Sequence, residues 1–373
     1  MNSDRKISIF LPSLRGGGAE RAMILFAQGA IQAGYKVDLL LSEKSGPLET
    51  LVDPAVCVIS FQQPRVARSL PALVGYLKRE QPLALYSTIP HANCISILAG
   101  LLSRTPFQAS SKRTRIIVRE SNSPVSETKA SFSRKITHWL TPYLYPLADN
   151  IIAVSNGVRD EIGRISPRSL RKTTVCHTPV YLPHFEELAQ EACPHAWLSH
   201  KSIPVYLGIG RLTPQKNFSL LLKAFTSIRR KHPARLIILG EGALRKKLIE
   251  QADALGIADD ISLPGFALNP FPYLKRADCF VLSSDFEGMP NVLIQALTMG
   301  TKVVATDCPS GPRECLGEGN YGRLVPVGDK NALADAMEQV LNDEPNPKIA
   351  AIMKERYGVP ATTAAYLKLA GLE

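Results

Sequence analysis

Residues 6–41 read KISIFLPSLRGGGAERAMILFAQGAIQAGYKVDLLL, and this stretch indicates the fold. It opens with a short apolar run typical of a strand and passes through the triplet Gly16 to Gly18. Apolar residues then recur with the spacing of a helix that has one buried face, at positions 23, 24, 27, 30 and 31. Gly34 can end this helix, and residues 36–41 resume as a strand. The stretch therefore predicts a β-α-β unit.

The same alternation continues along the chain and restarts in its second half. Further strands are expected at residues 84–86, 115–118, 150–154, 203–208, 235–239, 279–282 and 302–306. Segment 180–203 is rich in Pro, His and acidic residues and is typical of a linker. Strands that alternate with helices imply parallel sheets covered by helices on both faces.

We therefore predict an α/β protein with two Rossmann-like parallel-sheet domains facing a central cleft. The N-terminal domain is expected at 1–185 and the C-terminal domain at 200–355, and a C-terminal helix at about 357–373 could pack back on the first domain. The length of 373 residues fits two domains better than one. Ligands of such sheets bind beyond the carboxyl ends of the strands, so the loops there should carry the chemistry.

The composition is that of a globular protein with a basic first half. Hydrophobic residues make up 45% of the chain and charged residues 21%, which excludes a disordered chain. The net charge is +11, and residues 104–135 hold eight basic residues against two acidic ones. Such a segment attracts nucleic acid, an anionic membrane surface or a diphosphate-bearing substrate, or is a solvated face without a partner. No nucleic-acid module signature accompanies it, so we expect no nucleic-acid partner.

No segment is expected to span a membrane. The longest apolar candidate, 95–102, is far shorter than a membrane-spanning helix, and the run 7–11 is too brief for a signal sequence. We therefore expect a cytoplasmic protein. Because the basic segment 104–135 lies beside the run 95–102, we hypothesise a peripheral contact with the anionic inner face of the membrane; a buried helix is the alternative for the run.

The cysteines indicate neither disulfides nor a metal site. Their number is odd and no Cys-x-x-Cys pair occurs among positions 57, 94, 176, 193, 279, 308 and 315. Most lie in apolar runs, which favours buried, reduced thiols. The chain also lacks an Asp-x-Asp triplet for a divalent cation, so no metal and no cofactor are expected.

The loop after the first strand of the second half reads GIGRLTPQKN (208–217) and contains two cations. Arg211 offers a fork-shaped guanidinium and Lys216 a point-charge ammonium, a pair that suits a diphosphate. A surface loop with two basic residues explains the pattern equally well.

A second loop, within 283–295, reads SSDFEGMPNVLIQ. Pro290 and the polar residues before it mark a helix start, whose bare N–H groups form an anion site. This helix start is therefore expected to face the phosphate held by Arg211 and Lys216. Glu287 would repel a phosphate, so we expect it to accept hydrogen bonds from sugar hydroxyls.

Taken together, the chain resembles the GT-B-fold glycosyltransferases of family 4, which are metal-independent, retaining enzymes. The resemblance runs nearly end to end and is carried by GGGAER (16–21), GRLTPQKN (210–217), GEG (240–242), PGF (264–266), SSDFEGMPNVLIQAL (283–297), ATDCPSGPRE (305–314) and YGRLVPVGD (321–329). The resemblance implies transfer of a sugar, with retention, from a nucleotide-sugar donor to a hydroxyl of a glycan or lipid-linked acceptor.

The resemblance also assigns residue roles. Arg211 and Lys216 would bind the donor diphosphate, and Glu287 would contact the donor sugar near the reacting carbon. His91 follows a first-domain strand and could face the acceptor or the sugar, so we add it to these three as a catalytic candidate; a loop histidine without a chemical duty is the alternative. The expected donor-binding residues are Gly16, Gly17, Gly18, Arg211, Lys216, Phe266, Glu287, Gly288, Met289, Pro290, Asn291 and Gln295.

One position departs from the family pattern. The family usually places a second glutamate eight residues after the first, where it grips both ribose hydroxyls, and this chain has Gln295 there. Replacing charge-assisted hydrogen bonds by neutral ones should cost roughly 1 kcal/mol of donor affinity. A non-catalytic sugar-nucleotide or membrane-lipid binding protein of the same fold is therefore the alternative function. A dinucleotide-dependent oxidoreductase is excluded, because no Gly-x-Gly-x-x-Gly is followed by a ribose-binding acid.

Overall fold

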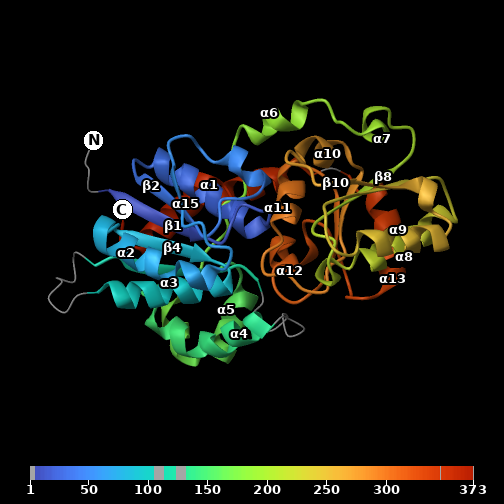
Figure 1. The fold of residues 1–373 in the computed structure, drawn as a ribbon. Helices are drawn as coiled ribbons and strands as arrows, with labels where there is room; N and C mark the ends of the chain where they lie inside the picture. The colour runs from blue at the N-terminus through green and yellow to red at the C-terminus, as the bar shows by residue number, and fades with distance from the viewer. Residues whose placement is uncertain (1–4, 105–112, 123–131, 345, 373) are drawn as a thin grey trace. The chain divides into compact units, whose positions relative to one another are not determined.

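The computed structural model describes residues 5–104, 113–122, 132–344 and 346–372. The chain divides into two compact units (Figure 1). The first unit comprises Met1–Pro179 together with Val359–Glu373, and the second comprises Val180–Gly358. The chain therefore passes between the units twice.

The first unit is built on a parallel sheet with the strand order β3-β2-β1-β4-β5-β6-β7. Its strands are β1 (Lys6–Leu11), β2 (Lys36–Leu41), β3 (Cys57–Ser60), β4 (Ala84–Thr88), β5 (Arg115–Glu120), β6 (Asn150–Ala153) and β7 (Thr173–Val175). Its α-helices are α1 (Gly18–Gln32), α2 (Leu70–Glu80), α3 (Pro90–Ser103), α4 (Phe132–Leu144), α5 (Asn156–Ile165) and α15 (Val359–Leu369). Short 3-10 helices are η1 (Pro47–Leu51), η2 (Val66–Ser69), η5 (Tyr145–Leu147) and η6 (Pro167–Lys172).

The β-α-β unit at the start of the chain forms as its sequence predicts. Helix α1 buries Met23, Ile24, Ala27 and Ala30 against the sheet, and β1 and β2 pair in parallel. Gly34 follows the helix with φ +85°, a left-handed conformation that glycine adopts without strain. The apolar run 95–102 lies within α3, and most of its side chains are at least partly buried.

Helix α15 packs on α1 in the first unit (Figure 1). Its residue Tyr366 is fully buried, and its ring lies 5.2 Å from that of Phe26. The hydroxyl of Tyr86 donates to the carbonyl of Tyr366 at 3.0 Å. Arg119, at the end of β5, donates to the Tyr366 hydroxyl at 3.0 Å and to Thr178 at 2.8 Å. The last described helix of the chain is therefore part of the first unit's core.

The second unit repeats the architecture with the strand order β10-β9-β8-β11-β12-β13, again all parallel. Its strands are β8 (Val205–Ile209), β9 (Arg235–Leu239), β10 (Ile261–Gly265), β11 (Cys279–Leu282), β12 (Val303–Thr306) and β13 (Arg323–Val325). Its α-helices are α6 (Phe185–Gln190), α7 (Ala196–Ser199), α8 (Phe218–Arg229), α9 (Arg245–Ala254), α10 (Phe271–Arg276), α11 (Asn291–Thr298), α12 (Pro312–Cys315), α13 (Lys330–Gln339) and α14 (Pro347–Arg356). Its 3-10 helices are η7 (Pro214–Lys216), η8 (Ala258–Asp260), η9 (Gly317–Gly319) and η10 (Val340–Asn342).

The segment 180–203, which the composition indicates as a linker, is an ordered part of the second unit. Helix α6 packs on α10, where the rings of Phe185 and Phe271 stack with their centroids 4.5 Å apart. Asn269 donates a hydrogen bond to the carbonyl of Leu188 at 3.1 Å. Packing of apolar rings therefore overrides the polar composition of this segment.

The second sheet has the strand order 3-2-1-4-5-6 of a doubly wound fold, and the first sheet has the same order with a seventh strand at its edge. In such sheets the strand order reverses beside the first strand, and ligands bind at the carboxyl end of that reversal. The reversal lies between β1 and β4 in the first unit and between β8 and β11 in the second. The loops that follow these four strands are therefore the first places to look for a site.

Candidate functional site

The loops after β8 and β11 are joined to each other by hydrogen bonds. We call residues 210–217 the β8 loop and residues 283–290 the β11 loop. The Gln215 side chain donates to the carbonyl of Phe286 at 3.0 Å, and the Ser283 hydroxyl donates to the carbonyl of Lys216 at 2.9 Å. Asn217 has φ +43° and donates to Asp285 at 2.7 Å while capping α8. The two loops therefore form one rigid surface at the strand-order reversal.

Lys216 and Glu287 form an ion pair within this surface. The Lys216 Nζ and Glu287 Oε1 atoms are 2.5 Å apart, and the two side chains are only 14% and 7% exposed. The Ser284 hydroxyl donates to the same carboxylate oxygen at 2.6 Å. The Lys216 stem lies across Gly210, where a Cβ atom would come within 3.1 Å of it. A side chain at residue 210 would therefore press on the methylene stem of Lys216.

Arg211 is the second cation of the β8 loop. Its side chain is exposed, and it makes no ion pair or hydrogen bond with any residue that the structure describes. Lys216 is partly neutralised by Glu287, whereas the charge of Arg211 is uncompensated. The guanidinium is therefore available to an anionic ligand.

A glycine turn after β9 packs against the backbone of the β8 loop. Gly240 has φ +137°, and a Cβ atom there would lie 2.0 Å from the carbonyl oxygen of Gly210. A Cβ atom at Gly242 would lie 2.5 Å from the carbonyl oxygen of Leu212. Leu212 in turn donates its backbone N–H to the carbonyl of Glu241 at 2.9 Å. Only glycine permits this close backbone approach.

The loop after β12 packs against the β11 loop. The Glu287 backbone N–H donates to the carbonyl of Pro309 at 3.3 Å. Gly311 has φ +90°, and a Cβ atom there would lie 2.7 Å from the carbonyl oxygen of Gly288. Ser310 has φ +63°, a strained conformation for a residue with a side chain. The third loop singled out from the sequence therefore lies beside Glu287.

Helix α11 begins at Asn291, one residue later than predicted, with Pro290 as its N-cap. Its start is four residues after Glu287, so the positive end of the helix dipole directly follows the β11 loop. Met289 is buried just before the helix, and Gln295 is 7% exposed one turn into it. The Gln295 side chain makes no hydrogen bond within the described residues.

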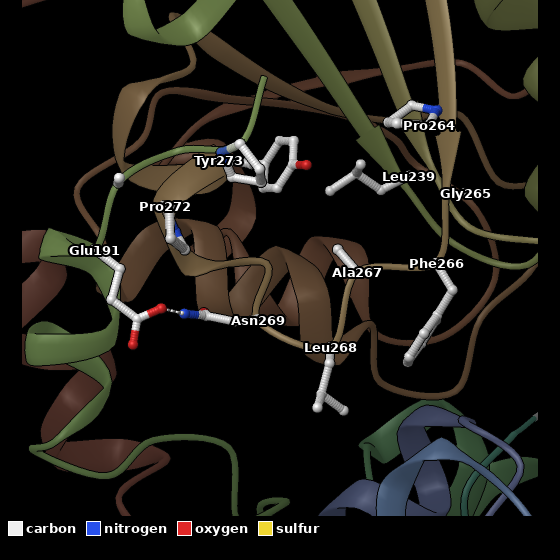
Figure 2. A pocket seen from close by; sticks show the side chains of 12 residues that line it. Glu191, Leu239, Pro264, Gly265, Phe266, Ala267, Leu268, Asn269, Pro272 and Tyr273 are labelled. Carbon is white, nitrogen blue, oxygen red and sulfur yellow. Dashed lines mark hydrogen bonds between the residues drawn. The ribbon is translucent and has the colours of Figure 1, made fainter. Parts of the chain in front are cut away.

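A pocket of about 310 Å³ lies beside this surface, at the carboxyl ends of β9 and β10 (Figure 2). Leu239 and Tyr273 line its interior, and Phe266, which is 43% exposed, stands at its edge. Asn269 closes one side by donating to Glu191 at 2.8 Å. Phe266 was predicted from the sequence to bind the donor, whereas Glu191 was not singled out, because the composition of 180–203 indicates a linker.

The remaining predicted residues belong to the first unit, at the reversal between β1 and β4. The triplet Gly16 to Gly18 connects β1 to α1, and Gly16 has φ +104°. His91 lies in the first turn of α3, directly after Ile89 and Pro90. Ile89 has φ +78°, which is rare for a β-branched residue and marks local strain. Burial lowers the pKa of the nearby Arg21 guanidinium, in the first turns of α1, to about 10.

Comparison with known proteins identifies the family. The model described as "Glycosyl transferases group 1" matches residues 193–356, and the model described as "Glycosyltransferase Family 4" matches residues 16–182. A Campylobacter jejuni protein named N-acetylgalactosamine-N,N'-diacetylbacillosaminyl-diphospho-undecaprenol 4-alpha-N-acetylgalactosaminyltransferase is 30% identical over 346 residues, which are 91% of each chain. This chain belongs to the family 4-type glycosyltransferases.

Other relatives of the glycosyltransferase agree with this assignment. A second Campylobacter jejuni protein, an alpha-1,4-N-acetyl-D-galactosaminyltransferase named for an undecaprenol-linked substrate, is 26% identical over 351 residues, covering 91% of this chain and 89% of its own. The structure of Anabaena HepE in complex with UDP and glucose aligns over 98% of both chains at 19% identity, with a TM-score of 0.75. Sucrose-phosphate synthase from Thermosynechococcus elongatus aligns over 98% of both chains at 17% identity, also with a TM-score of 0.75. The glycosyltransferase has the GT-B fold.

Four cations of the basic segment 104–135, at positions 104, 113, 115 and 119, are engaged inside the first unit. Arg104 and Arg113 pair with Asp149, and the guanidinium of Arg115 donates to the carbonyl of Ala370. Arg119 is 2% exposed and donates hydrogen bonds to Tyr366 and Thr178. Residues 105–112 and 123–131 lie outside the described part of the chain. The charges that the structure describes in this segment therefore stabilise the fold.

Two further features of the glycosyltransferase concern metals and membranes. Within the described residues, no group of three or more His, Cys, Asp and Glu side chains is arranged to hold a metal ion. All seven cysteines are free, and all except Cys57 are buried. None of the helices in the described ranges has the length and apolar character needed to cross a bilayer.

Proposed function

We propose that this glycosyltransferase moves a sugar from a nucleoside diphosphate donor to a hydroxyl of a lipid-linked or polysaccharide-precursor acceptor, with retention at the anomeric carbon and without a metal ion. One observation carries the proposal. The ammonium of Lys216 lies against Glu287, just before α11, and the uncompensated guanidinium of Arg211 lies on the same rigid surface. Positive charge is thus preorganised where a departing diphosphate would need it.

The geometry of the ion pair supports separate roles for its two members. An ammonium has three N–H donors, and Lys216 gives one of them to Glu287, so the others are left for phosphate oxygens. The Oε1 atom of Glu287 accepts from Lys216 and from Ser284, whereas its second oxygen accepts from no described residue. We assign that second oxygen to a hydroxyl of the donor sugar. The buried amide of Gln295 would meet the ribose.

The relatives support the class of substrate. The names of two Campylobacter jejuni relatives include an undecaprenol-linked substrate, and the similar HepE structure contains UDP and glucose. We therefore propose a UDP-linked sugar and a polyprenyl-diphosphate-linked acceptor as the first pair to test. A lipid-linked acceptor would place the enzyme at a membrane surface.

The test has two stages. A panel of UDP-, GDP- and ADP-sugars is screened for protection of the protein against thermal unfolding, and the best donor is then incubated with polyprenyl-linked glycans. We expect one nucleotide class to raise the unfolding temperature and nucleoside diphosphate to be released only when an acceptor is present. Donor binding without release for every acceptor would contradict turnover and would favour the non-catalytic binding function. The anomeric configuration of the product, read by NMR, tests retention.

A further inference from the structure

Helix α4 presents large apolar side chains to solvent. Trp139 and Tyr143 are 65% and 64% exposed, Ile136 is 44% exposed, and Leu147, in the short helix η5 that follows α4, is 45% exposed. The rings of Trp139 and Tyr143 contact each other with centroids 5.7 Å apart. Positions 136, 139 and 143 have the spacing of a single helix face. We call these four residues the α4 stripe.

The outward orientation of the α4 stripe is fixed by the opposite face of the helix. Thr141 and Leu144 are 3% and 8% exposed, and α4 packs on α3 of the same unit. The Thr141 hydroxyl donates a hydrogen bond to the carbonyl of Thr137 at 2.9 Å. The helix thus buries a threonine and exposes one of the chain's two tryptophans. This inverted pattern indicates that the exposed face meets an apolar partner.

A group of exposed cations lies near the C-terminal end of α4. The hydroxyl of Ser166, just before η6, donates to the carbonyl of Pro142 in α4 at 3.2 Å. The ammonium of Lys172, at the end of η6, donates to the carbonyls of Pro146 and Ala148 at 2.8 Å, in η5 and directly after it. Within residues 162–185 the sequence contains no acidic residue. Three arginines there are exposed and form no ion pair in the described part of the chain: Arg164, Arg168 and Arg171. We call these three the arginine rim.

We propose that the α4 stripe and the arginine rim form a docking surface for an anionic lipid membrane. Tryptophan and tyrosine favour the boundary between headgroups and acyl chains, because their rings are apolar and their N–H and O–H groups remain hydrated. Arginines beside an apolar helix face add attraction to anionic headgroups. A second copy of this chain fits less well, because a symmetric contact would bring two arginine rims together.

The docking surface goes beyond the proposed transfer reaction and does not use the donor site. None of its residues belongs to the β8 or β11 loops, which lie in the other unit. Membrane binding and donor binding can therefore be measured separately. A negative result for membrane binding would not contradict donor binding, and the reverse also holds.

The experiment uses the full-length protein and co-sedimentation with vesicles of phosphatidylcholine alone or mixed with phosphatidylglycerol, at low and high salt. We expect the wild-type protein to bind the anionic vesicles at low salt, with a blue shift of tryptophan emission that Trp139→Phe abolishes. Combined Arg168→Glu and Arg171→Glu should weaken binding to anionic vesicles by about tenfold or more, since each surface cation contributes about 1 kcal/mol. Combined Trp139→Ser and Tyr143→Ser should weaken binding at both salt concentrations.

Helix α9 offers a matched control in the second unit. It exposes Ile249, which is 43% exposed, beside the exposed cations Lys246 and Lys247. The triple variant with Ile249→Ser, Lys246→Glu and Lys247→Glu should co-sediment with vesicles as the wild type does. Each docking variant should keep the thermal stabilisation that the nucleotide sugar gives, which shows that it is folded.

Three results would overturn the docking proposal. The first is wild-type protein that does not bind anionic vesicles. The second is a lack of difference between variants: the docking variants bind vesicles as the wild type does, or the α9 control loses as much vesicle binding as they do. The third is a concentration-dependent dimer that Trp139→Ser dissociates while vesicle binding is unchanged, which would assign the stripe to a second copy. Vesicle binding without nucleotide stabilisation would instead contradict the proposed donor and leave the docking surface in place.

Discussion

Lys216 and Glu287 hold each other in position across 71 residues of sequence. Both side chains are largely buried, so removing one partner leaves the other without its counter-charge. In the proposed reaction the pair would position the donor as well as supply positive charge. Ser284 supports the same pair through its hydrogen bond to Glu287.

Glu287→Gln should lower kcat/KM for sugar transfer by about a hundredfold or more, the loss typical of removing one preorganised group from a transition state. Lys216→Met should do the same, because the leaving diphosphate would lose a cation. Steady-state kinetics with the best donor measure both effects. The control is Lys231→Met, which breaks an exposed ion pair of similar length, Lys231–Glu338 at 2.7 Å, elsewhere in the same unit. Wild-type rates in the Glu287 variant would remove it from the mechanism.

Gln295→Glu should restore charge-assisted hydrogen bonds to the ribose. We expect transfer to continue with a donor KM that is lower by about fivefold, corresponding to roughly 1 kcal/mol. The measurement is the donor KM at saturating acceptor. A large rise in KM would mean that this buried position does not tolerate a carboxylate and that the ribose is held elsewhere. Gln295→Leu should raise KM and provides the opposite comparison.

At the scale of elements, the glycine turn after β9 sets the position of the β8 loop. Gly240→Ala should push the backbone of residue 210 away, because the added Cβ would lie 2.0 Å from its carbonyl oxygen. We expect a loss of stability of about 2 kcal/mol or more, together with weaker donor binding. Thermal unfolding with and without donor measures both.

Gly256→Ala is the matched control for this turn. Gly256 also has a positive φ, +69°, but a Cβ atom there would meet nothing within 4 Å. Its substitution should cost only the backbone strain, about 1 kcal/mol, and leave donor affinity unchanged. Equal effects of the two substitutions on donor binding would show that the turn does not position the β8 loop.

Sequence patterns predicted the buried central elements better than the edges. Strands β1, β2, β9 and β11 were expected with the bounds that the structure gives, because each is a short, mostly apolar run. Strands β3, β7, β10 and β13 were missed, since they lie at the edges of the two sheets and are only partly buried. Segment 180–203 was misjudged because its packing depends on the contact between Phe185 and Phe271, 86 positions apart in sequence.

For the candidate site, the sequence predicted which loops lie together but not how their side chains contact each other. The topology rule places the loops after β8 and β11 together, and both contain the expected residues. The sequence assigned Lys216 to the diphosphate and Glu287 to the sugar, without indicating that the two side chains pair. Side-chain pairing depends on local backbone geometry, such as the left-handed Asn217, which no spacing rule encodes.

At the scale of the whole molecule, the first unit depends on a helix that follows the second unit in sequence. Deleting residues 359–373 removes the buried Tyr366 and leaves the buried guanidinium of Arg119 without one of its hydrogen-bond acceptors. Each large apolar side chain lost from a core costs about 1.5–3 kcal/mol, so we expect the first unit to unfold at a markedly lower temperature. Calorimetry with and without the nucleotide sugar measures the change.

The second unit should keep its own transition, raised by the nucleotide sugar, in the same deletion variant. Tyr366→Phe is the milder comparison, because it removes only the hydroxyl that Arg119 bonds, and it should lower the first transition less. An unchanged first transition after the deletion would show that α15 contributes nothing to that core.

The return of α15 to the first unit also has a consequence for biosynthesis. A ribosome delivers the chain from its N-terminus, and most N-terminal domains can finish folding while later ones are still being made. Here the first sheet emerges early. Helix α15, which packs on α1 and accepts a hydrogen bond from Tyr86, is translated only after all of the second unit. We therefore expect the nascent first unit to keep an open apolar surface, of the kind that chaperones bind, until α15 has been translated.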